Sequence, residues 1–124
     1  WVYVAYLCQQ AVERQLKGMY VYYMGAEAPK THNLNFLFKK VTDSEKFQQE
    51  ADMERFAARR AEAEDFLIDL MFYYMSDYPF SYKNISSRFV GRDLALQLYA
   101  KAKETVVWLR SFQPETAIPR MDEK

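Results

Sequence analysis

The sequence predicts an all-α protein, an up-and-down antiparallel bundle of four to five helices. Only 3 of its 124 residues are glycine and 4 are proline, and apart from Gly18 they lie between periodic segments rather than inside them, which is typical of helices. Apolar residues recur within these segments at helical spacing. Half of the residues are hydrophobic and 17% are aromatic, so the chain is apolar enough to bury one core and a disordered chain is not expected.

Composition also limits the class of partner. The 17 basic residues balance the 17 acidic ones, so nothing draws the whole molecule to nucleic acid or to an anionic membrane, and any anion site must be local. Binding of RNA is therefore not supported by the charge. The single cysteine, Cys8, cannot form an internal disulfide, and a cytoplasmic location is the default expectation.

The chain opens on the apolar run WVYVAYL. This run is too short to span a bilayer, since polar Gln9 and Gln10 follow it directly, and no basic region precedes it as in a signal sequence. We therefore expect no membrane segment. The chain starts without a methionine, so we expect it to begin inside a longer protein.

The first predicted helix, over about residues 1–24, is amphipathic. Gln10, Glu13, Arg14 and Lys17 are expected to form its polar face, with Glu13 placed to support Lys17 at i, i+4. Gly25 is expected to end the helix. The opposing apolar stripe consists of Trp1, Val4, Ala5, Cys8, Ala11, Val12, Leu16, Met19 and Tyr23.

The second predicted helix is short. Thr31 is its expected N-cap, because a threonine hydroxyl can accept a hydrogen bond from one of the unpaired N–H groups at a helix start. Pro29 precedes this start. The apolar face of the helix consists of Leu34, Leu37, Phe38 and Val41.

The third predicted helix covers residues 43–76. A capping box from Thr42 to Glu45 begins it, and Pro79 forbids its continuation. Unbroken, it would measure about 50 Å at about 1.5 Å per residue, which is long for a small domain. We expect it either to kink near Ala57–Arg60 or to project its first half from the bundle.

The last predicted helix runs from about Gly91 to Phe112, after a loop of tyrosines, serines and basic residues. The bundle is expected to occupy residues 1–113, and residues 114–124 form a flexible tail broken by proline. The buried stripe of the last helix consists of Leu94, Ala95, Leu98, Ala102, Val106, Leu109 and Phe112.

Motifs for catalysis and for metal binding are missing from the sequence. There is no GxGxxG, P-loop, CxxC or HExxH. Cys8 and His32 alone supply too few ligands for zinc, so neither a metal nor a cofactor is expected. Cys8 lies on the apolar stripe, where cysteine behaves as a small inert hydrophobe, which makes a Cys–His nucleophile pair the weaker interpretation. We favour a non-catalytic role.

The aromatic residues leave two interpretations open. The ten tyrosines and nine phenylalanines could serve packing, each phenol reaching a polar partner. They could also offer a stacking platform for a base, since Lys83 and Arg88 lie close in sequence to Tyr78 and Tyr82.

His32, the only histidine, also has two compatible interpretations. Its ring could buttress the start of the second helix beside Thr31. Alternatively, Lys30, Thr31 and His32 could form an anion site there, since the N–H groups and the dipole of a helix start favour phosphate.

These residues together resemble the HEPN domain family, named for its nucleotide-binding domains in higher eukaryotes and prokaryotes. The resemblance covers about residues 1–112. It is carried by QQAVERQLKGMYVYYMG, PKTHNL, the dipeptide Tyr78-Pro79 and ALQLYAKAKETVVWL. The matching positions are Gln9, Gln10, Ala11, Glu13, Lys17, Gly25, Thr31, His32 and Leu34.

Several expectations follow from the resemblance alone. It implies a bundle of four or five helices, a homodimer, and an association with a minimal nucleotidyltransferase. Some such domains are ribonucleases, including toxins of toxin–antitoxin pairs, and these use an arginine followed four to six residues later by a histidine near the start of the last helix.

The sequence departs from the family in three places. No histidine follows Arg88 or Arg92, so the ribonuclease pair is missing. In the family another helix usually precedes the helix that carries QQA, and this sequence starts too late to include it. The segment between THNL and Tyr78-Pro79 is longer than usual, and Asp77 stands where an arginine often precedes this dipeptide, which weakens an anion site there.

The leading hypothesis is a non-catalytic module that binds a nucleotide of the ATP or GTP type, or a partner, together with a minimal nucleotidyltransferase. A phosphate site would use Lys17, Lys30, Thr31 and His32, with Arg14 and Lys83 as secondary candidates. One alternative is a structural dimerisation or adaptor bundle without ligand. The other, a ribonuclease toxin, is disfavoured.

Overall fold

The structure, a computed structural model, describes residues 2–74 and 91–114. Within these ranges it contains five helices and no strand, so the predicted all-α fold is confirmed: α1 (Val2–Met24), α2 (Leu34–Thr42), α3 (Glu45–Glu50), α4 (Met53–Tyr74) and α6 (Arg92–Arg110). Trp1, the Tyr78-Pro79 dipeptide, Lys83, Arg88 and residues 115–124 lie outside the described residues.

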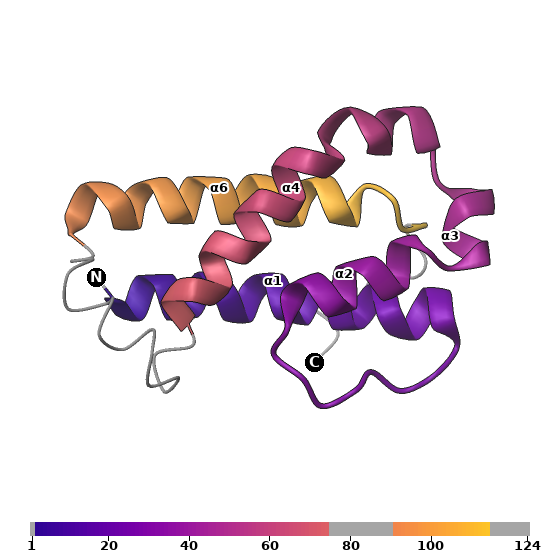
Figure 1. Ribbon diagram of the computed structural model, residues 1–124, viewed down its shortest axis with the longest axis horizontal. Coiled ribbons are helices and arrows are strands. Elements are labelled where there is room, and N and C mark those ends of the chain that lie inside the picture. Colours follow the sequence, from indigo (N-terminus) through magenta and orange to yellow (C-terminus); the bar gives the residue numbers. More distant parts are fainter. Residues whose placement is uncertain (1, 75–90, 115–124) are drawn as a thin grey trace.

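The helices pack around α1 (Figure 1). Helix α6 lies along α1 and runs in the same direction, and this pair makes the most extensive contact between elements. Helix α4 crosses the pair obliquely and runs back against it, while α2 covers the C-terminal half of α1. The segment between α1 and α2 therefore has to return along α1 before α2 begins.

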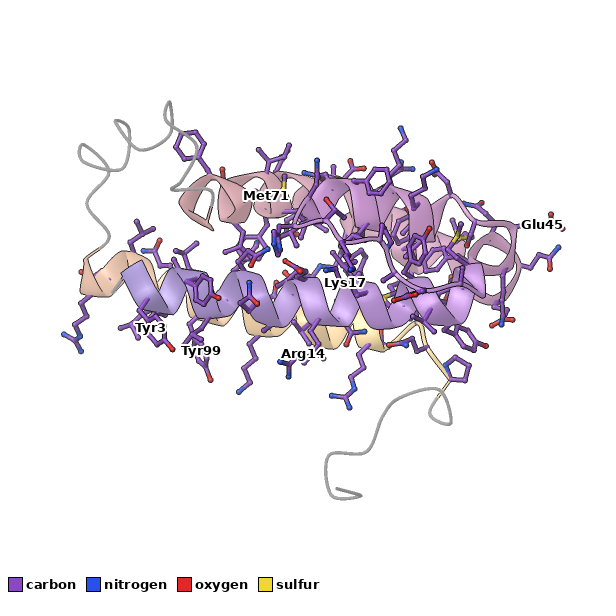
Figure 2. The ribbon with its side chains drawn as sticks, turned by 90° about the horizontal axis from the view of Figure 1, so that it is seen from below. Tyr3, Arg14, Lys17, Glu45, Met71 and Tyr99 are labelled. Atoms are coloured by element: carbon purple, nitrogen blue, oxygen red, sulfur yellow. The ribbon has the colours of Figure 1, made fainter. Side chains whose placement is uncertain are left out.

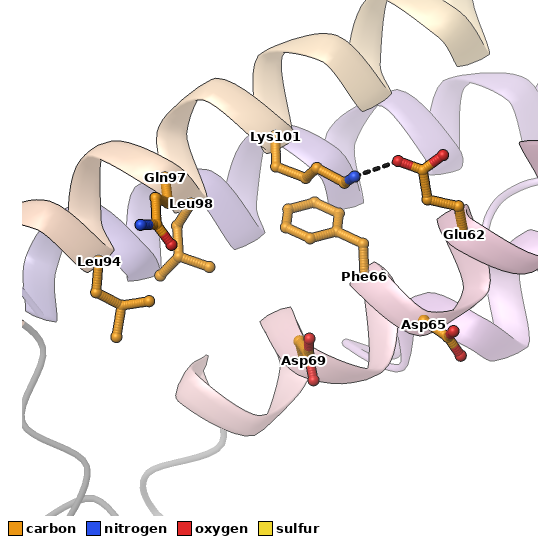
Figure 3. Close-up of a pocket in the computed structure, with 8 residues that line it drawn as sticks. All are labelled: Glu62, Asp65, Phe66, Asp69, Leu94, Gln97, Leu98 and Lys101. Carbon is orange, nitrogen blue, oxygen red and sulfur yellow. Dashed lines mark hydrogen bonds and ion pairs between the residues drawn. The ribbon is translucent and has the colours of Figure 1, made fainter.

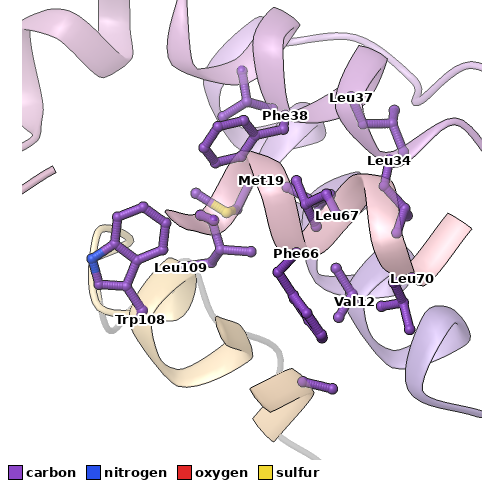
Figure 4. Packing of buried hydrophobic residues seen from close by; sticks show 14 of the residues in the cluster. Val12, Met19, Leu34, Leu37, Phe38, Phe66, Leu67, Leu70, Trp108 and Leu109 are labelled. Atoms are coloured by element: carbon purple, nitrogen blue, oxygen red, sulfur yellow. The ribbon is translucent and has the colours of Figure 1, made fainter. Parts of the chain in front are cut away.

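The core lies where these helices meet (Figure 4). Leu16 and Met19 of α1, Leu37 and Phe38 of α2 and Leu67 of α4 are almost fully buried. Burying one such side chain stabilises the fold by about 1.5–3 kcal/mol. The predicted stripes of the second and last helices face this core, but Ala11 of the first predicted stripe is exposed.

An aromatic cluster closes the end of the bundle at which α3 lies. Phe56 stacks on Trp108 with ring centroids 5.6 Å apart, and Phe47 meets Phe56 edge to face at 5.2 Å. Phe112 contacts all three rings. The Tyr23 hydroxyl donates to the Phe112 carbonyl oxygen, so the end of α1 is tied to the segment after α6.

The third predicted helix is divided into α3 and α4, and its predicted capping box is wrong. Thr42 is the last residue of α2, where its hydroxyl donates to the Phe38 carbonyl oxygen at 2.8 Å, and Ser44 is the N-cap of α3, accepting from the Phe47 N–H at 3.2 Å. The chain is extended at Ala51, and Asp52 accepts from the Arg55 N–H at 3.1 Å as α4 begins.

Helix α4 is unbroken through residues 57–60, and the kink expected near Ala57–Arg60 stays a prediction. The first half of the predicted third helix does not project from the bundle, because Phe47 and Phe56 are both buried. None of the helices described here is long and apolar enough to cross a membrane.

Candidate functional site

Gly25 sets the direction of the α1–α2 linker. Its φ of +65° lies in the left-handed region that favours glycine, and its N–H donates to the Val21 carbonyl oxygen at 3.1 Å. Gly25 thus ends α1 as the sequence predicts. The chain turns here, and the linker places His32 beside the middle of α1.

Glu13 is the centre of a hydrogen-bonded network on this side of α1. Its carboxylate accepts from Gln9 Nε2 at 2.8 Å and pairs with Lys17 Nζ at 2.8 Å. The Nδ1 atom of His32 lies 2.9 and 3.1 Å from its two oxygens. Gln10 Nε2 in turn donates to Gln9 Oε1 at 2.7 Å. The network joins the linker to α1.

Burial of Glu13 would by itself raise the pKa of its carboxyl group. The hydrogen bonds from Lys17, Gln9 and His32, together with the charge of Lys17, outweigh this effect and lower the pKa below its ordinary value. The carboxylate is therefore ionised at neutral pH and can only accept hydrogen bonds. His32 Nδ1 must then carry a hydrogen, so Glu13 fixes the tautomer and the orientation of the ring.

The expected polar face of α1 needs correction. Glu13 is buried rather than facing solvent, and Gln9, which was not expected on this face, is buried beside it. His32 of the linker contacts Glu13. Lys17 is half-buried and lies on the side of α1 that faces α2 and α4, whereas Arg14 is exposed on the opposite side with Tyr3 and Tyr99 (Figure 2).

The predicted N-cap of α2 also needs correction. Asn33 is the cap, accepting from the Phe36 N–H at 2.9 Å, and the Thr31 hydroxyl accepts from the Asn33 N–H at 3.1 Å. The Leu34 N–H points to Met71 Sδ at 3.1 Å. Several N–H groups expected to hold a phosphate at this helix start therefore have partners within the chain.

The structure thus brings together only some of the predicted site residues. Lys17 and His32 meet through Glu13, and Lys30 and Thr31 precede His32 in the linker. Arg14 lies elsewhere, and Lys83 lies outside the described residues. Sequence reasoning missed Gln9 and Glu13 as members of the site. The spacing of Gln9, Glu13 and Lys17 at i, i+4 and i+8 was the signal that could have found them.

Cys8 has the properties of a packing residue. It is buried, and burial raises the pKa of its thiol, which disfavours the reactive thiolate. Within residues 2–74 and 91–114 no group of three or more His, Cys, Asp or Glu side chains is placed to hold a metal ion.

A groove between α4 and α6 is lined by charged and apolar side chains (Figure 3). Lys101 pairs with Glu62 across it, above the ring of Phe66. Farther along α4, Arg59 pairs with Glu104 of α6 and Arg60 with Glu64. Lys101, Arg59 and Arg60 therefore each have a carboxylate partner within the chain.

A second groove, of about 480 Å³, lies between α1 and α6 and is almost wholly apolar. Its walls include Leu7 and Ala11 from α1 and Tyr99 and Val107 from α6, and Lys103 is its one charged lining residue. Among the described residues ten large hydrophobic side chains are exposed, of which five lie on α1 and three on α6. Three of them, Leu7, Tyr99 and Val107, line this groove, and clustered exposed apolar side chains of this kind mark interaction sites.

Comparison with known proteins gives one match. The protein-family model described as HEPN domain matches residues 1–112. No curated protein matches the chain, and no solved structure does so either.

Proposed function

Because this chain belongs to the HEPN domain family, which covers nucleotide-binding and ribonuclease-type modules, we propose that it is a non-catalytic HEPN module that binds a partner protein. The partner that the family suggests is a minimal nucleotidyltransferase. The observation that carries this proposal is the apolar groove between α1 and α6, edged by Leu7, Tyr99 and Val107, each of which is about half exposed. Exposed apolar surface that is gathered in one groove is a mark of interaction sites.

The proposal that the module is non-catalytic rests on the number and the position of its histidines. His32 is the only histidine in the sequence, and it precedes α2 rather than following an arginine in the last helix. Its Nδ1 is held by Glu13 at the linker. The arginine–histidine pair expected of a HEPN ribonuclease is therefore missing from the sequence.

Co-expression with a minimal nucleotidyltransferase, chosen from the reading frames that neighbour its gene, tests the proposal. We expect the two proteins to elute together from size exclusion with the mass of a complex, and we expect no cleavage of added RNA. Separate elution of the two proteins would contradict the proposal that a nucleotidyltransferase is the partner. RNA cleavage that disappears in Arg92→Ala would contradict the non-catalytic role.

Nucleotide binding is the second candidate, and the arrangement of Lys17, Lys30 and His32 supports it. Lys17 and His32 share the Glu13 carboxylate, and Lys30 is exposed two residues before His32. A phosphate could approach these cations from solvent. Glu13 opposes the binding of phosphate here, because its negative charge lies within 3 Å of both Lys17 and His32.

Isothermal titration with ATP and GTP tests this candidate, with a melting scan as a second readout because a bound ligand raises the melting temperature. Binding through this site should weaken in Lys30→Ala and Lys17→Ala. Lys39→Ala, which removes an exposed cation on α2, is the matched control. No heat and no shift in the native protein would reject nucleotide binding.

A further inference from the structure

The indole nitrogen of Trp108 is the one buried polar side-chain atom without a hydrogen-bond partner in the part of the chain that the structure describes. The residue is 7% exposed. Its nitrogen lies on the side of the ring that faces away from Phe38, Met19 and Leu109 (Figure 4). A buried donor without an acceptor is costly, and nearly all such donors in native proteins have an acceptor in the protein, in water or in an ion.

Trp108 lines a hollow of about 680 Å³ between the start of α4 and the side of α6. Arg55 and Arg59 belong to the α4 wall, and Trp108 and Ser111 belong to the opposite wall. No residue of α1 lines this hollow, and its volume is that of a small-molecule site. A ridge of α6 separates it from the apolar groove and consists of Tyr99, Lys103 and Val107.

Arg55 has no carboxylate partner among the described residues. Its guanidinium lies 4.1 Å from the centroid of the Phe112 ring, and it donates to the Ser111 hydroxyl oxygen at 2.9 Å and to the Ser111 carbonyl oxygen at 3.4 Å. The Ser111 hydroxyl donates in turn to the Trp108 carbonyl oxygen. A guanidinium has five N–H donors, so Arg55 is held in place while several of its donors stay available to a ligand.

Arg59 is the second cation of the hollow. Its guanidinium lies 5.9 Å from the centroid of the Trp108 ring and pairs with Glu104. The side chain is 38% exposed, so it is free to turn. Lys103 adds a third cation, which no carboxylate within the described residues engages. The lining thus carries three cations against one carboxylate, and a local excess of positive charge attracts anions.

We propose that this hollow binds a phosphate group, free or carried by a small molecule, with Arg55 and Arg59 paired to its oxygens and with the Trp108 N–H donating to one of them. Arginine presents its donors in a fork that matches phosphate geometry. The Trp108 N–H is closed to water, so a neighbouring side chain has to move on binding. Arg59 is this side chain, and it exchanges Glu104 for the phosphate.

The number of donors favours phosphate over a carboxylate. Arg55, Arg59 and Trp108 are three donor groups from two helices. A phosphate monoester offers three strong acceptor oxygens, whereas a carboxylate offers two. The site shares no residue with Lys17, Lys30 and His32, and it goes beyond the proposed function.

The indole N–H itself reports the outcome in a nitrogen–proton correlation spectrum. The chain has two tryptophans, so the spectrum contains two indole signals, and Trp108→Phe identifies the one from Trp108. Inorganic phosphate and phenyl phosphate, each added at constant ionic strength, should move this signal saturably. The tighter binder of the two identifies the source of the phosphate. A signal that neither compound moves, or that acetate moves at equal concentration, would overturn the proposal.

Arginine variants locate the phosphate. Arg55→Gln and Arg59→Gln should each weaken binding by at least about tenfold, because each removes a charge-assisted hydrogen bond. Arg60→Gln is the matched control, since it removes the same charge from the same helix outside the hollow. It should leave the affinity unchanged. Equal weakening by all three variants would mean unspecific attraction to surface charge and would overturn the proposal.

Glu104→Gln makes a prediction of opposite sign. Glu104 competes with the ligand for Arg59 and repels it. Removal of its charge should therefore tighten phosphate binding severalfold in the same titration. Weaker binding in Glu104→Gln would contradict the exchange of Glu104 for phosphate.

Thermal melts separate the binding role of Trp108 from its packing role. A ligand of the folded state raises the melting temperature, so phosphate should raise it in the native protein and less in Trp108→Phe, which keeps a ring but removes the donor. Arg55→Gln changes an exposed side chain and should also reduce the increase, which keeps the test valid if Trp108→Phe does not fold. Equal increases in the native protein and Arg55→Gln would reject the site.

Failure of this proposal is distinguishable from failure of the proposed function. A nucleotidyltransferase complex that forms in a protein without phosphate binding would retain the proposed function and reject the hollow. Phosphate binding that moves the Trp108 signal without such a complex would do the reverse. Lys17→Ala should leave the Trp108 response unchanged, because Lys17 does not line the hollow.

Discussion

Glu13 is a buried carboxylate with three donors around it, from Gln9, Lys17 and His32. A charge in this position is stable only while the donors remain in place. Because Gln9 and Lys17 belong to α1 and His32 belongs to the linker, Glu13 also holds a non-local contact. The QQA and TH motifs therefore act on the same carboxylate in this fold.

Replacement of Glu13 by glutamine should destabilise the protein. Glu13→Gln keeps the shape of the side chain but removes the charge that Lys17 and His32 share, and hydrogen bonds to charged groups contribute about 1.5–3 kcal/mol each. Since Lys17 and His32 are partly exposed, we expect a loss of about 1–2 kcal/mol in the free energy of unfolding. Urea denaturation at pH 7 measures it. Glu27→Gln, at an exposed linker residue, should be neutral.

The lowered pKa of Glu13 also makes a prediction for acid stability. A group whose pKa is lower in the folded state stabilises that state fully above its unfolded pKa. This contribution should be lost as the pH falls below the ordinary value of 4.5 and through the folded pKa. Unfolding free energies measured between pH 7 and pH 3 should therefore fall less in Glu13→Gln than in the native protein. Parallel curves for the two proteins would contradict the assignment.

At the scale of single elements, the helix boundaries follow side-chain caps. Asn33, Ser44 and Asp52 each accept from the N–H three residues ahead, at Phe36, Phe47 and Arg55. Gly91, in contrast, begins α6 without a side-chain cap. Caps of the first kind satisfy N–H groups that would otherwise lack partners at the helix start.

The start of α2 offers a direct test of which residue is the cap. Asn33→Ala removes the acceptor for the Phe36 N–H and should cost about 1 kcal/mol of stability. Thr31→Ala removes only an exposed bond to the Asn33 N–H and should cost less. Thermal denaturation of the two variants compares them, and a larger cost for Thr31→Ala would restore threonine as the functional cap.

How far the sequence predicts this fold depends on whether a feature is local. The stripes of α2 and α6 and the end of α1 at Gly25 follow from spacing and from glycine chemistry, which act within a few residues. The break at Ala51–Asp52 was missed because neither residue is glycine or proline. Burial of Glu13 was missed because it depends on a linker that returns to α1 from nineteen positions away. The apolar groove was missed because it forms only when α1 and α6 are side by side.

At the scale of the whole molecule, the two ends of the bundle differ. Rings from α2, α3, α4 and α6 and the residue Phe112 pack together at one end, including Phe38, Phe47, Phe56 and Trp108. Toward the other end, α4 and α6 are separated by the groove that Phe66, Asp69 and Leu94 line. We expect the aromatic end to carry most of the stability.

The substitution Phe56→Ala tests whether the aromatic end of the bundle carries most of the stability. The Phe56 ring contacts four other rings, and Phe-to-Ala changes in a core cost about 3–5 kcal/mol. Phe36→Ala, at a half-exposed ring on α2, should cost less than about 1 kcal/mol. Chemical denaturation compares the two variants. Similar costs would mean that the aromatic end does not dominate.

The pairing of α1 with α6 has a consequence for biosynthesis. During translation α1 leaves the ribosome well before α6 is made, so the face that α6 will cover stays in water while about ninety residues separate the two partners. Contacts between segments this distant close late and slow folding, and apolar surface exposed in the meantime is prone to aggregation. Nascent chains stalled before α6 should accordingly bind a chaperone, and they should be released from it once that helix has emerged from the ribosomal tunnel.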